Sequence, residues 1–143
     1  MKKEALEILN TLKEYKEEIS NEYFDLFLEK LILASVGLMA SDGEFEKQEL
    51  EMYVKACTML GLDLNTEIMV LSLKDSNIRE KLIDLLVELI NSMKKSGLPN
   101  EFLKTLLILS MRYLKAAANS DGEFEEEEAL YISPLLEIYE SIA

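Results

Sequence analysis

Apolar residues recur at spacings of three and four along nearly the whole chain, and this spacing is typical of amphipathic α-helices. Phe24, Phe27, Leu28 and Leu31, for example, would all lie on one face of a helix. Only 2 prolines and 5 glycines are available to interrupt helices, and we find no strand signal. The sequence therefore predicts an all-α fold.

Residues that cap or stop helices divide this pattern into about seven segments. The expected helices cover roughly 3–19, 22–39, 50–60, 66–73, 78–96 and 100–118, and the last begins near 126. Asn21, Asn65 and Asn77 are suitable N-caps. Gly61 and Gly97 are suitable stops, because glycine readily adopts the left-handed conformation that ends many helices.

Pro134 falls inside the last segment. Proline has no backbone N–H, and its ring clashes with the preceding turn of a helix. We therefore expect the last helix to kink or split at Ser133.

Composition and charge narrow the classes of function. The chain has 143 residues, 49% of them apolar and 30% charged, which predicts one globular domain spanning 1–143. A net charge of −13 argues against binding nucleic acid or an anionic membrane, and it favours cations or basic proteins as partners.

With Cys57 as the single cysteine, no intrachain disulfide framework can form. No signal peptide or apolar stretch of about 20 residues is seen, so we expect a cytoplasmic protein without direct membrane insertion.

One short acidic motif occurs twice. The sequence reads SDGEFEKQE at 41–49 and SDGEFEEEE at 120–128, with seven of nine residues identical. Each copy follows a long apolar helix and precedes another helix. This duplication predicts one compact bundle that contains two pseudo-repeated helix–DGEF–helix hairpins.

The motif is rich in carboxylate oxygens, which are the ligands that calcium, magnesium and manganese prefer in proteins. A glutamate follows each glycine by six residues, as in the second half of an EF-hand loop. The first half is missing, because Leu38 and Ala40 stand where the first copy would need ligands. The candidate metal ligands are Asp42, Glu44, Glu46, Glu49, Asp121, Glu123, Glu125 and Glu128. If successive helices alternate in direction, the helices before the two motifs point the same way and both motifs lie at one end of the molecule. The motifs would then be two halves of one divalent-metal site. Calcium is the first candidate for the ion, and magnesium and manganese are the alternatives.

Two other interpretations remain open. Ser41 with Glu44 and Ser120 with Glu123 are capping boxes, so the motif could serve only to start helices. The competing function is a metal-free helical interaction module with an acidic docking surface for a basic partner. The chain has no histidine, so it cannot contain a nucleophile that a histidine activates. No substrate-binding motif accompanies the carboxylates either. We therefore expect a protein that is not an enzyme.

At these two motifs the sequence resembles the TerB family, the tellurite-resistance-associated helical domain. The family signature is a small residue, then D-G-x-apolar, then a glutamate in the next helix, and it is matched at Ala40–Glu49 and again at Asn119–Glu128. The chain departs from the family at Glu46 and Glu125, where a Ser, Thr or Asp cap is common.

The resemblance implies about seven helices in two related halves and a divalent metal, with calcium the expected ion, held through Asp42, Glu49, Asp121 and Glu128. It also implies a role in stress response or tellurite resistance. The expected partner is then a protein in a larger complex, which in this family can be membrane-associated.

Overall fold

The computed structural model describes residues 3–39, 47–62, 76–118 and 126–142. All regular structure in these ranges is α-helical, so the all-α prediction is confirmed. The helices are α1 (Lys3–Glu18), α2 (Glu22–Met39), α3 (Lys47–Leu60), α5 (Ser76–Lys95), α6 (Asn100–Ala118) and α7 (Glu126–Ser141). The helix predicted over roughly 66–73 lies outside the described residues.

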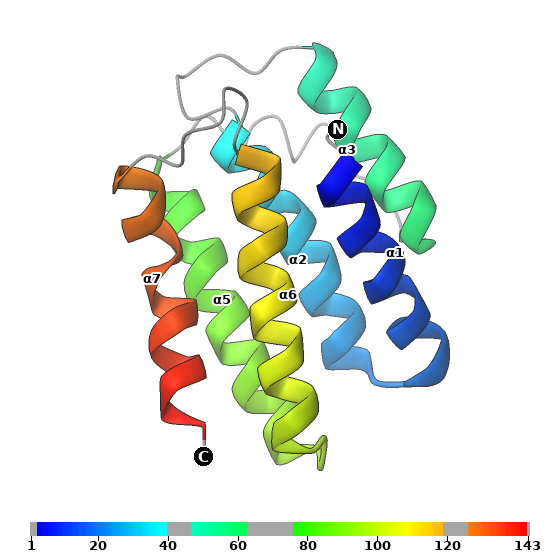
Figure 1. Cartoon of the computed structure of the whole chain (residues 1–143), viewed down its shortest axis with the longest axis vertical. Helices are drawn as coiled ribbons and strands as arrows, with labels where there is room; N and C mark the ends of the chain where they lie inside the picture. Colours follow the sequence, from blue (N-terminus) through cyan, green and yellow to red (C-terminus); the bar gives the residue numbers. More distant parts are fainter. Residues whose placement is uncertain (1–2, 40–46, 63–75, 119–125, 143) are drawn as a thin grey trace.

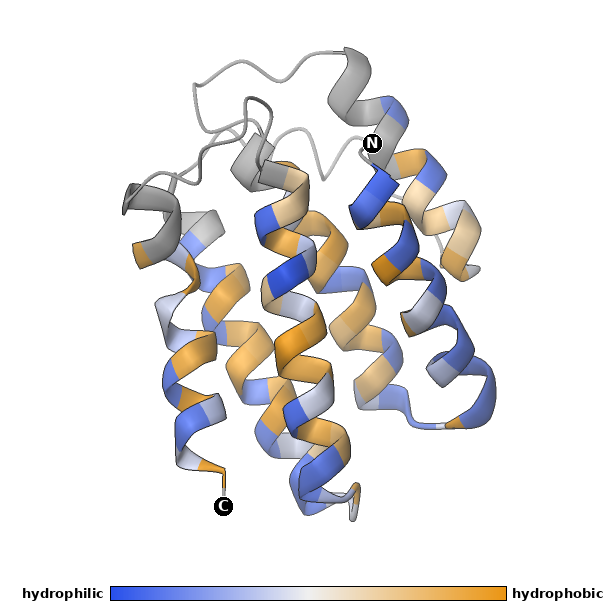
Figure 2. Cartoon of the chain, in the orientation of Figure 1, coloured by the Kyte–Doolittle hydropathy of each residue, from blue (hydrophilic) through white to orange (hydrophobic). Residues whose placement is uncertain are grey.

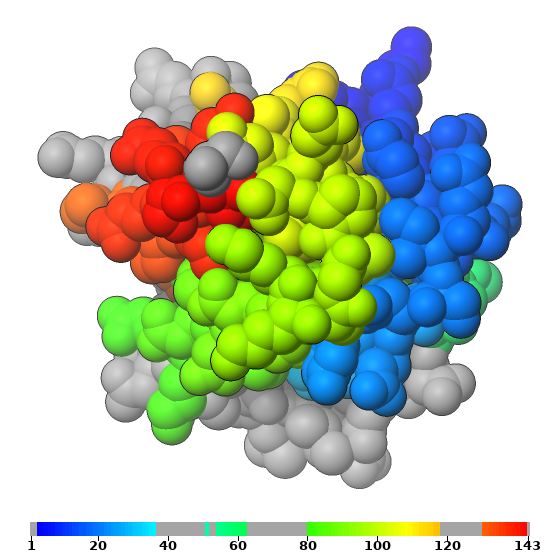
Figure 3. Space-filling model, turned by 90° about the horizontal axis from the view of Figure 1, so that it is seen from below, coloured from blue at the N-terminus to red at the C-terminus, as the bar shows by residue number. Residues whose placement is uncertain are grey.

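The helices form one bundle in which α2 and α6 occupy the middle (Figure 1). These two helices run in the same direction, and the other helices that the structure describes run the opposite way. Within each half, the helix before the acidic motif packs against the helix after it, α2 against α3 and α6 against α7. The two predicted hairpins are therefore present. Seen from below, the beginnings of α2 and α6 and the end of α7 lie on one face of the molecule (Figure 3).

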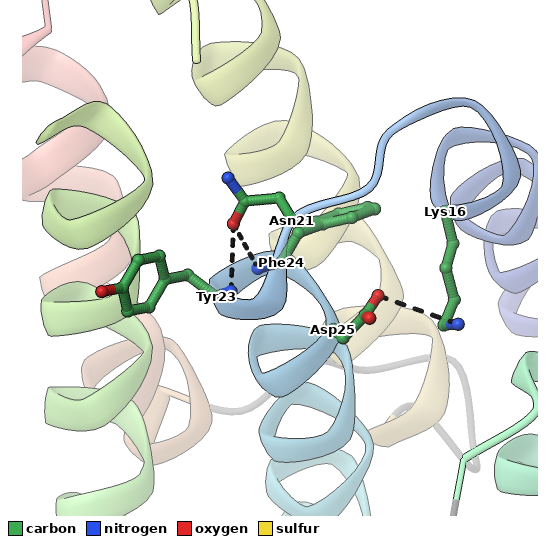
Figure 4. A network of polar contacts seen from close by, with 5 residues as sticks. All are labelled: Lys16, Asn21, Tyr23, Phe24 and Asp25. Carbon is green, nitrogen blue, oxygen red and sulfur yellow. Dashed lines mark hydrogen bonds and ion pairs between the residues drawn. The ribbon is translucent and has the colours of Figure 1, made fainter. Parts of the chain in front are cut away.

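The start of α2 is fixed by Asn21, as predicted. Its side-chain oxygen accepts hydrogen bonds from the backbone N–H groups of Tyr23, at 3.0 Å, and Phe24, at 3.2 Å (Figure 4). These two N–H groups have no partner within the helix, so an acceptor at this position stabilises the first turn. The Asn21 amide also donates to the hydroxyl of Ser96 at 3.0 Å, which ties the beginning of α2 to the segment just after α5.

Glycines end α3 and α5, as predicted. Gly61 has a φ of 68°, and the N–H of Leu62 donates to the carbonyl of Cys57 at 2.9 Å. This six-to-one hydrogen bond is the Schellman arrangement, which satisfies a carbonyl that the helix leaves free. Gly97 has a φ of 103° and closes α5 with the same pattern of bonds.

One predicted helix boundary is wrong, and one of the two alternatives expected at Pro134, the split, is excluded. Asn77 is not an N-cap, because α5 already begins at Ser76. The last helix is not split at Ser133, because α7 continues through Pro134. The proline leaves the carbonyl of Leu130 without its usual backbone donor, and the hydroxyl of Ser133 donates to that carbonyl at 2.9 Å. A side chain thus replaces the hydrogen bond that proline removes.

A single hydrophobic core connects the helices (Figure 2). Its largest fully buried side chains include Phe24, Phe27 and Tyr113. Phe102 packs edge-on against Phe24, with ring centroids 5.5 Å apart, and against Tyr15 at 5.6 Å, so α1, α2 and α6 share one aromatic cluster. Although α2 is strongly apolar, none of the helices described here is long and apolar enough to cross a membrane.

Candidate functional site

Most of the predicted metal ligands fall outside the part of the chain that the structure describes. These are Asp42, Glu44, Glu46, Asp121, Glu123 and Glu125. The remaining two lie in helices, Glu49 as the third residue of α3 and Glu128 as the third residue of α7. The last glutamate of each motif therefore occupies the same position in the helix that follows it.

The helices that lead into the two motifs lie side by side. α2 ends at Met39 and α6 ends at Ala118, and these ends lie at the same end of the molecule (Figure 1). Both α3 and α7 begin at this end as well. The prediction that α2 and α6 point the same way is confirmed. It rested on alternating helix directions along the chain.

A buried polar contact joins α2 to α6 near this end. The hydroxyl oxygens of Ser35 and Tyr113 lie 2.8 Å apart, and both residues are fully buried. Ser35 donates its only hydroxyl proton to the carbonyl of Ile32 at 2.6 Å, so Tyr113 is the donor to Ser35. Ser35 and Tyr113 lie four and five residues before the ends of α2 and α6, or about 6 to 8 Å along each helix.

This contact bears on the distance between the two motifs. Packed helices have their axes about 8–10 Å apart. Because Ser35 and Tyr113 fix α2 and α6 in direct contact close to their ends, the chain enters both motifs from neighbouring points. Such a separation is compatible with carboxylates from the two copies reaching one ion.

Burial is the main influence on the ionisation of Tyr113. It raises the pKa of the phenol well above its ordinary value, and the nearby Cys57 thiol raises it further. The phenol is therefore neutral at physiological pH and acts only as a hydrogen-bonding group.

Within the described ranges, no group of three or more His, Cys, Asp or Glu residues is placed to hold a metal ion. Comparison of the chain with known protein families, with curated proteins and with solved structures finds no match in any of the three. The resemblance to the TerB family thus has no support from these comparisons. It stays a prediction that rests on the two acidic motifs.

Proposed function

We propose that this chain is a non-enzymatic helical module that binds a divalent cation, calcium first, through carboxylates of both acidic motifs acting together. One observation carries the proposal. The helices that precede the two motifs, α2 and α6, are parallel, in contact and joined by a buried hydrogen bond near the ends that lead into the motifs.

The chemistry of calcium makes cooperation between the copies necessary. Calcium takes about 6–8 oxygen ligands, more than the four candidate carboxylates of one motif supply with one oxygen each. The candidate ligands of the two copies together are eight carboxylates. Carboxylates brought close to one another also repel, and a bound divalent cation relieves that repulsion. Binding should therefore stabilise the folded chain.

Thermal unfolding of the cation-free protein with added calcium, and separately magnesium, tests the proposal. A ligand that binds only the folded state raises the melting midpoint, by on the order of 10 °C at a concentration about 100 times the Kd. The variants Asp42→Asn and Asp121→Asn should each remove most of the shift, and the double variant should remove no more than either alone. Asp84→Asn on α5 is the matched control and should keep the shift.

Two results would contradict the proposal. One is a midpoint that does not move at millimolar cation, and the other is a shift that survives in the double variant. A midpoint that stays constant would favour the metal-free interaction module instead. A link to stress response or tellurite resistance belongs to the TerB resemblance and remains a prediction of that resemblance alone.

A further inference from the structure

The helices α5 and α7 lie side by side and run in the same direction (Figure 1). Two hollows of about 490 and 540 Å³ lie between them, and they adjoin because Asp84 and Pro134 line both. We call these two hollows together the α5–α7 groove. Its apolar lining includes Ile83 and Val87 from α5 and Leu130 and Ile138 from α7.

The lining residues follow helical spacing on both sides of the groove. Among the side chains that the structure describes, they run on α5 from Glu80 to Asn91 and on α7 from Leu130 to Ser141. Each stripe covers eleven residue steps, or about 16 Å along a helix. The groove is therefore as long as three turns of an α-helix that lies in it.

Leu130 is the most exposed large hydrophobic residue in the described part of the chain, with 67% of its surface accessible. The next is Leu136 with 46%, also on α7 but not among the residues that line the groove. Leu130 is not isolated, because it lines the groove together with Ile83, and an apolar patch rimmed by polar residues is typical of a surface that another molecule covers.

The charged residues that line the groove are acidic. Glu80 and Asp84 contribute carboxylates from α5, and Glu137 contributes one from α7, whereas no Lys or Arg stands among the described lining residues. All three carboxylates belong to exposed residues. A partner with apolar residues on one face and basic residues beside them would complement both features of this groove.

We infer that the α5–α7 groove binds a basic amphipathic helix of a partner protein. Helices dock in such grooves through apolar residues at positions i, i+3, i+4 and i+7. A second copy of this chain is a poorer occupant, because each copy carries a net charge of −13 and the two would repel. The inference does not depend on cation binding at the acidic motifs.

Fluorescence anisotropy with a labelled amphipathic peptide of leucine and lysine tests the inference. A length of about 14 residues, or about 21 Å of helix, is sufficient to fill the groove. A peptide with glutamate in place of lysine is the charge control. Both titrations are done with a chelator present, so that failure of the cation proposal leaves this result unaffected.

One pair of variants tests the apolar contact. Leu130→Asp should weaken binding of the leucine–lysine peptide about tenfold, since it places a charge among the apolar contacts at one end of the groove. Leu136→Asp makes the same change on the same helix outside the groove, and it should weaken binding less than about twofold. Leu130→Ser serves in place of Leu130→Asp if circular dichroism shows that the latter does not fold.

A second pair tests the charge. Glu137→Lys lies in the groove, and Glu140→Lys changes the net charge by the same amount on an exposed position of α7 outside it. Glu137→Lys should weaken binding several-fold more than Glu140→Lys, and added salt should reduce this difference.

Four outcomes would overturn the inference. The first is no binding of the leucine–lysine peptide at about 0.1 mM, which corresponds to a contact too weak to be specific. The second is equal binding of the glutamate peptide, and the third is an equal effect of the two variants within either pair. The fourth is a dimer in sedimentation velocity that Leu130→Asp converts to a monomer. The last outcome would show that the groove is filled by a second copy of this chain.

Discussion

The hydroxyl of Tyr113 donates a hydrogen bond to the hydroxyl of Ser35 at 2.8 Å, and the hydroxyl of Ser35 donates one to the carbonyl of Ile32 at 2.6 Å. This short chain of hydrogen bonds crosses from α6 to α2 inside the core. Every polar atom in it is buried and paired, so the two helices have one preferred rotational and axial setting. The two acidic motifs follow these same helices, and the contact therefore bears on stability and on the proposed site alike.

Removing either partner of this contact should destabilise the fold, but by different amounts. Tyr113→Phe leaves Ser35 bonded to Ile32 and should lower the free energy of unfolding by about 1 kcal/mol. Ser35→Ala leaves a buried phenol without its acceptor and should lower it by about 1–3 kcal/mol. Urea unfolding followed by circular dichroism measures both values.

The double variant is the control for this explanation. It removes the phenol hydroxyl together with its acceptor, so its loss should be smaller than the sum of the two single losses. Additive losses, or a larger loss for Tyr113→Phe than for Ser35→Ala, would show that the two hydroxyl groups are not coupled.

Tyr113 should also make the fold sensitive to alkali. Burial raises its pKa in the folded state, whereas in the unfolded chain a tyrosine has a pKa of about 10. Above that pH the unfolded state binds fewer protons than the folded state, so the free energy of unfolding falls as pH rises. The contribution is fully present below about pH 10 and declines above it by up to about 1.4 kcal/mol per pH unit.

Urea unfolding at several values between about pH 9 and pH 11.5 checks this sign. Tyr113→Phe is the matched variant, because it removes the titrating phenol and keeps the ring. Its free energy of unfolding should fall less steeply with pH than that of the parent chain. Identical slopes would mean that another group is responsible for the alkaline loss of stability.

The parts of the fold that were predicted correctly depend on local signals. Asn21, Gly61 and Gly97 act on backbone groups within a few residues, and the spacing of apolar residues determines which face of each helix is buried. The contact between Ser35 and Tyr113 was missed, because its partners are 78 residues apart. One signal for this contact was available, since Ser35 and Tyr113 are residues with a hydroxyl group that stand within the apolar pattern of the two helices that precede the motifs.

For the candidate site, too, the sequence predicts local features but not those that depend on how the helices pack. The sequence makes acidic residues such as Asp42 and Asp121 candidate ligands by their chemistry and spacing, but these residues lie outside the described ranges and stay predictions. The α5–α7 groove was not predicted at all. It depends on which sides of two helices remain uncovered after packing, and Leu130 differs from a core leucine only in that respect.

The cap at Asn21 has two functions that substitution can separate. Asn21→Ala removes the acceptor for two backbone N–H groups and should lower the free energy of unfolding by about 1 kcal/mol. Asn21→Asp keeps this acceptor and loses only the hydrogen bond to Ser96, so it should retain most of the stability.

Asn91→Ala, at an exposed position within α5, is the control and should be neutral or slightly stabilising because alanine favours helices. Thermal melting of the three variants gives the comparison, and equal losses for Asn21→Ala and Asn21→Asp would contradict the capping role.

The continuity of α7 through Pro134 should depend on Ser133. In the parent chain, Ser133→Ala removes the hydroxyl that donates to the carbonyl of Leu130 and should lower the free energy of unfolding by about 0.5–1.5 kcal/mol. Pro134→Ala restores a backbone donor to that carbonyl and a residue of high helix propensity, so it should raise the free energy of unfolding by on the order of 1–3 kcal/mol.

The combination of both substitutions separates this compensation from an ordinary serine contact. Once Pro134→Ala supplies the backbone hydrogen bond, the carbonyl of Leu130 no longer needs the hydroxyl, so Ser133→Ala should then have almost no effect or should stabilise α7 slightly. Urea unfolding of the four proteins in this cycle measures the coupling between the two positions. If Ser133→Ala lowers stability equally with and without Pro134, the hydroxyl does not replace the bond that proline removes, and the helix is held through the proline by the packing of Leu135 and its other core residues instead.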